Sequence, residues 1–133
     1  MSFSNATETT IAAKIFTATA ISWDAATELD IHLHTADPGE TGASTLNEAS
    51  YGSYALVTVN RDATAWTVSG NTTTNDNDIV FPQCTSGSNT LTHFSITPEG
   101  STEILVSGTI NNIAVSTGIR PQIDANGLTI TFN

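Results

Sequence analysis

Positively charged residues are almost absent from this sequence. Of 133 residues only Lys14, Arg61 and Arg120 are basic, against 13 acidic residues, and the formal net charge is −10. A chain of that charge repels phosphate groups, so we expect neither nucleic acid nor anionic membranes as partners. Acidity of this kind by itself indicates simple solubility.

Cysteine is nearly absent too. Cys84 stands alone, which excludes an intrachain disulfide and a cysteine-based metal site. Its FPQC context is typical of a small apolar residue that fills space at a strand end. The sequence also lacks a run of apolar residues long enough for a transmembrane helix, and its N-terminus lacks the regions of a signal peptide.

Motifs of catalysis are missing as well. There is no GxSxG nucleophile motif and no glycine-rich phosphate loop, so we expect no enzyme activity and no cofactor. His32 and His34 share one face of a predicted strand and would bind a metal only with a third ligand such as His93, Asp30 or Asp37. We favour imidazoles that face solvent or a partner, where they would make assembly sensitive to pH.

Threonine, serine and asparagine are what the sequence has in abundance. Threonine favours strands, and serine and asparagine favour turns. Short alternating apolar runs follow one another from residue 27 to the end, about a dozen residues apart, and predict seven to nine strands. The expected class is all-β, as an antiparallel β-sandwich or a distorted barrel in one domain, residues 27–133. The predicted strands are residues 29–34, 55–60, 65–69, 79–81, 90–97, 103–110 and 128–132.

Two polar dipeptides mark expected interruptions. Asn111-Asn112 is predicted to end the strand before it, and Asn126-Gly127 is a two-residue hairpin signal. In residues 29–34 the apolar side chains alternate with polar ones, which predicts a half-buried strand. The exposed loop expected from Asp37 to Ser50 is longer than a compact sandwich needs, and such loops are usually functional or disordered.

Residues 1–26 form a separate N-terminal segment, predicted as a helix near residues 7–16 or as an extended arm. Asn5 with Glu8 resembles a capping box, whereas the threonines weaken a helix. The segment either covers the end of its own core or lies on a neighbouring subunit, where its ordering would add contacts. Its apolar residues are Ile11, Ile15, Phe16, Ile21 and Trp23.

Several stretches resemble a family of small virion structural proteins of tailed bacteriophages. They are HTADPGETG, NEASYGSYALVTVNR, RDATAWTVSGN, IVFPQCTSGSNTLTHFSI, EILVSGTI and the closing GLTITFN. The resemblance covers most of the chain from about Ile31 onward. Its better-understood members look like head decoration, or cement, proteins.

The resemblance implies a homo-oligomer, a trimer or dimer, that binds the major capsid protein on the outer surface of the virion and stabilises the shell. The partner contacts that we predict are Ile11, Ile15, Phe16, Ile21 and Trp23 in the arm, with Asp37, Pro38 and Glu40 in the loop. The alternative is a tail- or fibre-associated structural protein, with a carbohydrate-binding role if Tyr51, Tyr54 and Trp66 stack on sugars.

Overall fold

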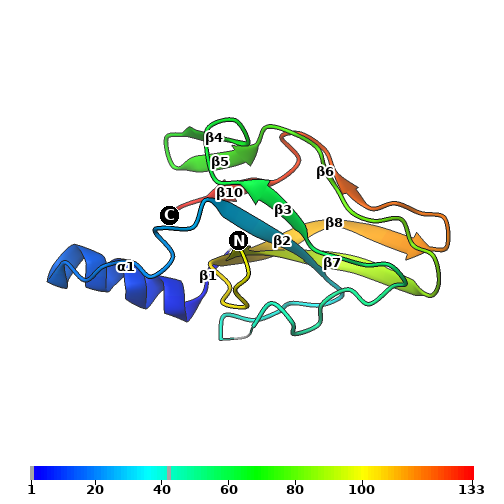
Figure 1. Ribbon diagram of the computed structural model, residues 1–133, viewed down its shortest axis with the longest axis horizontal. Helices are drawn as coiled ribbons and strands as arrows, with labels where there is room; N and C mark the ends of the chain where they lie inside the picture. Colours follow the sequence, from blue (N-terminus) through cyan, green and yellow to red (C-terminus); the bar gives the residue numbers. More distant parts are fainter. Residues whose placement is uncertain (1, 42) are drawn as a thin grey trace.

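The computed structural model describes residues 2–41 and 43–133, and in them ten strands form three antiparallel sheets (Figure 1). The largest sheet has the strand order β1-β8-β7-β2-β3. Its strands are β1 (Ser2–Phe3), β2 (Glu28–His34), β3 (Val57–Asn60), β7 (Ser88–Pro98) and β8 (Val106–Ser116). The long β7–β8 hairpin and β2 form the centre of this sheet, and β1 and β3 pair with its two edges.

Two smaller sheets pack over the large one. One has the order β10-β5-β4 and the other pairs β6 with β9. Their strands are β4 (Trp66–Ser69), β5 (Thr72–Asn75), β6 (Ile79–Val80), β9 (Gln122–Ile123) and β10 (Thr129–Thr131). Side chains from both layers meet in one core, where Ile31, Leu33, Phe94, Ile79 and Ile130 are each at most 4% exposed. The predicted all-β class is confirmed.

The N-terminal helix is present as α1 (Asn5–Thr17), which confirms the helical form of the arm. The predicted capping box is wrong by one residue, because Ser4 is the N-cap and its side chain accepts from the backbone N–H of Thr7 at 3.1 Å. The helix ends where Ala18 adopts a left-handed conformation, with φ 53°. In the described residues no helix has the length and apolarity needed to cross a bilayer.

Two predicted interruptions differ from the structure. Strand β8 runs through Asn111-Asn112, and the polar pair lies in a β-bulge, because Leu91 pairs with Ile113 while His93 pairs with Thr109. Residues 126 and 127 do not join a hairpin, since β9 pairs with β6 and β10 pairs with β5. Turn residues identify a change of direction, but not which strands pair across it.

Candidate attachment surface

Helix α1 projects from one end of the body, opposite the far ends of β7 and β8 (Figure 1). Among the residues that the structure describes, the hydrogen bonds from the helix to the body all come from its N-cap and first turn. The backbone N–H of Ser4 donates to the Leu105 carbonyl at 3.2 Å, and the buried Thr7 hydroxyl donates to the Ile104 carbonyl at 3.4 Å. The N–H of Asn5 donates to the Glu40 carbonyl at 3.1 Å. We call residues 4–7, which make these bonds, the root of α1; the rest of the helix extends away from it.

The free part of α1 carries its largest apolar side chains. Phe16 is 84% exposed and Ile15 is 67% exposed, whereas Ile11, one turn before Ile15, is half-buried. Residues four apart lie on the same side of a helix, so Ile11 and Ile15 form one stripe with Phe16 beside it. Large apolar groups exposed this fully, on an element that projects from the domain, are typical of a surface that another protein covers.

The residues after α1 bind back to the body. One guanidinium nitrogen of Arg61 donates to the carbonyls of Trp23, Asp24 and Ala26 at 3.3, 3.0 and 2.8 Å. The guanidinium carbon also lies 5.4 Å from the centre of the Trp23 ring, a cation–π contact. Trp23 and Ile21 are half-buried, and Arg61 holds Trp23 against the body.

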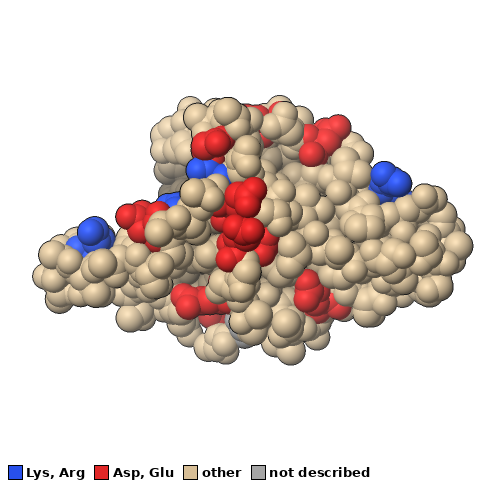
Figure 2. Space-filling model, viewed as in Figure 1, with Lys and Arg blue, Asp and Glu red and all other residues tan. Residues whose placement is uncertain are grey.

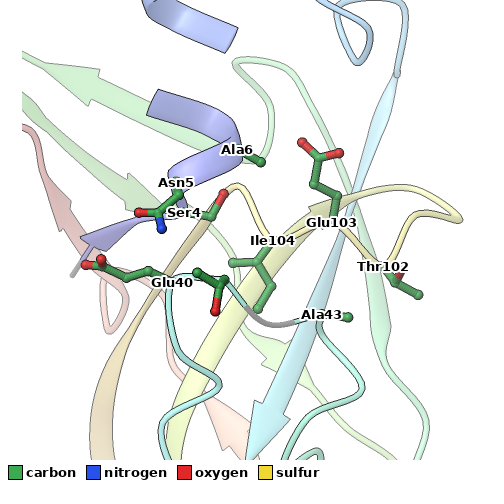
Figure 3. Close-up of a pocket in the computed structure, with 9 residues that line it drawn as sticks. Ser4, Asn5, Ala6, Glu40, Ala43, Thr102, Glu103 and Ile104 are labelled. Carbon is green, nitrogen blue, oxygen red and sulfur yellow. The ribbon is translucent and has the colours of Figure 1, made fainter. Parts of the chain in front are cut away.

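A hollow of about 420 Å³ lies where the root of α1 meets the loop after β2 and the turn between β7 and β8 (Figure 3). Asn5, Glu40, Ala43, Thr102 and Glu103 are among the residues that line it. The Glu40 carboxylate accepts from the Ser2 hydroxyl at 2.6 Å. The hollow is open and has two carboxylates at its rim, and sequence reasoning missed it because its walls come from three distant segments.

The three loop residues predicted as contacts occupy different environments. Asp37 and Glu40 are exposed, and the Asp37 carboxylate accepts from the N–H of Gly39 at 2.8 Å. Pro38 is fully buried, so its side chain is covered by other residues of this chain. Asp37 and Glu40 therefore remain available at the surface beside the root of α1.

Acidic side chains gather over the middle of the face shown in Figure 2, whereas the right-hand end is nearly free of charge. Two carboxylates, Glu28 and Glu99, lie at the start of β2 and in the β7–β8 turn. There, the nearby Glu28 carboxylate raises the pKa of the exposed Glu99, with further contributions from desolvation and Asp30. That end shows a single charged group, a basic one, which fits the sequence, because residues 79–98 and 104–119 contain no Asp, Glu, Lys or Arg.

The polar face of β2 is buried, contrary to the half-buried strand predicted. His32 is 3% exposed, His34 is fully buried and Asp30 is 4% exposed. The following loop covers the two imidazoles, whereas the Asp30 carboxylate accepts hydrogen bonds from β3 and from the β7–β8 turn. The imidazoles therefore do not face solvent. No group of three His, Cys, Asp or Glu side chains within residues 2–41 and 43–133 is placed to hold a metal ion.

The aromatic residues considered for sugar stacking are mostly covered. Tyr51 is 3% exposed, and its hydroxyl donates to the Pro82 carbonyl at 2.8 Å. Tyr54 packs edge-on against it, with ring centres 5.4 Å apart. Trp66 is half-buried and donates to the Asn60 carbonyl at 2.9 Å. These three rings therefore form no exposed stacking platform.

The chain matches a protein family across almost its full length. The family is described as podophage GP4 fiber I protein gp80, and the match covers residues 2–131. No curated protein matches the chain. The chain therefore belongs to the podophage GP4 fiber I protein gp80 family and is a phage virion structural protein.

Proposed function

We propose that this protein is a tail- or fibre-associated structural subunit of the virion, and that α1 attaches its β-sheet body to a neighbouring protein of the particle. The observation that carries the attachment role is the projecting helix, on which Ile15 and Phe16 are 67% and 84% exposed. The description of the family as a fibre protein supports the tail or fibre location over the capsid shell.

Burial of the exposed apolar side chains of α1, Ile15 and Phe16, can contribute a substantial part of a binding free energy. Full burial of one such side chain contributes about 1.5–3 kcal/mol, so two together contribute about 3–6 kcal/mol before the cost of association. Interfaces commonly depend on a few such anchors. The hydrogen bonds of Ser4 and Thr7 fix the start of α1 in the isolated chain, which lowers the entropy cost of ordering the helix when a partner binds.

The partner should combine an apolar groove with basic side chains. Glu40 and Glu103 line the hollow at the root of α1, and the acidic face with Glu28 and Glu99 lies beside the same turn. Opposite charges at the rim of an interface speed association and fix its orientation. We propose no enzymatic step, no cofactor, no nucleic acid and no membrane as part of this role.

Head decoration is the second candidate, with the protein bound as a homo-oligomer to the major capsid protein on the outer shell. The net charge of −10 favours it, because an acidic protein suits the face of a shell that points away from packaged DNA. The two candidates differ in copy number. Decoration requires hundreds of copies per virion, whereas a tail or fibre subunit requires a few to a few dozen.

Quantitative mass spectrometry of purified virions measures that copy number. The same phage carrying Ile15→Ser with Phe16→Ser should lose this chain from its particles, while the chain stays folded. Val68→Ser is the matched control, since Val68 is 71% exposed on β4 and lies outside α1. Normal incorporation of the double variant would show that the arm is not the attachment surface, and hundreds of copies would favour head decoration.

A further inference from the structure

One segment of the loop after β2 lies across the polar face of that strand. We call residues 43–49 the strap. The N–H of Ala49 donates to the Leu33 carbonyl at 2.8 Å, and the N–H of Thr35 donates to the Asn47 carbonyl at 2.9 Å. Between these bonds the strap excludes solvent from His32 and His34, which are at most 3% exposed.

Both imidazoles fasten the strap. His34 Nδ1 lies 2.9 Å from the Leu46 carbonyl, which can only accept, so this nitrogen carries a proton and donates it. His32 Nδ1 lies 2.7 Å from a Glu48 carboxylate oxygen, which also accepts from the Tyr54 hydroxyl at 3.0 Å. The other imidazole nitrogens face hydroxyl groups of β7, His32 Nε2 at 3.2 Å from Thr97 Oγ1 and His34 Nε2 at 2.8 Å from Ser95 Oγ.

A second proton on His34 is unfavourable in this position. Its Nε2 accepts from Ser95 in the neutral ring, so protonation reverses that bond and places a charge in a site without solvent. The titratable groups that face it are His32 on the same strand, His93 on β7 and Glu48 in the strap. Burial lowers the pKa of His34, the two histidines lower it further, and the Leu46 carbonyl and Glu48 offset part of the effect.

The opposite end of the strap meets the turn that seats α1. The N–H of Ser44 donates to the Thr102 carbonyl at 2.9 Å, and Ala43 forms a β-bridge with Glu103. The next residues of that turn, Ile104 and Leu105, hold the root of α1. The strap therefore connects the buried imidazoles with the base of the arm.

The strap also carries an unfavourable group. Ser44 is 1% exposed, and its hydroxyl has no hydrogen-bond partner among the described residues. A buried polar group left in this way costs about 1–3 kcal/mol. This cost opposes closure of the strap and therefore favours its release.

We propose that the strap is an acid-released clasp, which opens when the buried imidazole of His34 on β2 becomes protonated and thereby loosens the seat of α1. A released His34 takes up a proton near its ordinary pKa of about 6.5, whereas the buried ring resists it to lower pH. The closed strap is therefore fully favoured above that pH and loses this advantage as the pH falls. One linked proton changes the opening equilibrium by at most about tenfold per pH unit.

A role of the clasp in regulating attachment rests on the proposed function of α1. Release of the strap itself does not, because it is measured on the purified full-length chain without a partner. Hydrogen exchange followed by mass spectrometry at about pH 7.5 and about pH 5, corrected for intrinsic exchange, compares protection in the two states. We expect strap peptides and the peptide that contains Asn5 to lose protection at the lower pH, by at most about 30-fold, while residues 91–97 of β7 keep theirs. Unchanged protection of the strap would overturn the clasp, and an unchanged Asn5 would overturn its link to the arm.

His34→Asn identifies the group responsible. Its amide keeps a donor for the Leu46 carbonyl but does not titrate, so protection of the strap should become independent of pH. His93→Asn should keep the dependence on pH, because His34 is still present. The same acid loss in His34→Asn would contradict the assignment to His34. If that variant does not fold, NMR of the wild type gives the answer, because strap amide signals must follow the titration of the His34 ring, and a different midpoint would refute the proposal.

Discussion

Two phenylalanines provide a direct comparison between folding and attachment. Phe94 is 2% exposed in the core, and Phe16 is 84% exposed on α1. Phe94→Ala should lower the free energy of unfolding by about 3–5 kcal/mol, because it leaves a cavity between the sheets. Phe16→Ala should change it by less than about 0.5 kcal/mol, since the ring contacts little in the isolated chain.

Attachment to the particle should depend on Phe16, although the stability of the isolated chain does not. If a neighbouring protein buries the Phe16 ring, its removal costs about 1.5–3 kcal/mol of binding free energy, which weakens affinity roughly 10- to 150-fold. Urea denaturation of the purified chains gives the stabilities, and mass spectrometry of virions gives the incorporation. A loss of more than about 1 kcal/mol of stability in Phe16→Ala, or normal incorporation of that variant, would refute the reasoning.

Three further changes test the packing around the strap and its loop. Ser44→Ala should raise the free energy of unfolding in urea by about 1 kcal/mol, because it removes a buried hydroxyl without a partner, and a decrease would contradict this. Gly52→Ala should lower that energy by about 1–3 kcal/mol, since the added methyl group would lie against Ser86 Oγ and 2.9 Å from the Ser86 nitrogen, and an unchanged melting temperature would count against the close packing. Burial raises the pKa of Tyr54 well above 10 and that of Tyr51 in the same direction, so this contribution to stability is complete below about pH 10 and is lost as the pH rises. In an ultraviolet titration neither phenol should ionise with an ordinary midpoint while the chain is folded, and reversible ionisation near pH 10 would show that they are exposed.

Local patterns predicted much of the secondary structure. The alternation in residues 29–34 predicted β2, and the apolar spacing after Glu8 predicted α1. Both follow from side-chain periodicity within a few residues. The cap was misplaced because Ser4 and Asn5 are both favourable N-cap residues, and only the chain direction set by β1 decides between them.

Local sequence patterns could not predict the features that depend on contacts between distant segments of the chain. The alternation in β2 predicted an exposed polar face, because no neighbouring residue in the sequence indicates that the strap covers His32 and His34. Asn111-Asn112 reads as an end, yet β7 continues beside β8 and the extra residues form a bulge. The exposure of Phe16 likewise depends on where the body ends, so the sequence suggested an attachment residue without showing that it projects.

Cryo-electron microscopy of the intact virion tests the central claim most directly, because it locates this chain and the surroundings of α1 together. We expect its density on the tail or a fibre, with Ile15 and Phe16 enclosed by a neighbouring protein. Density spread over the outer capsid shell would contradict the proposed location, and an α1 that points into solvent would contradict the proposed means of attachment.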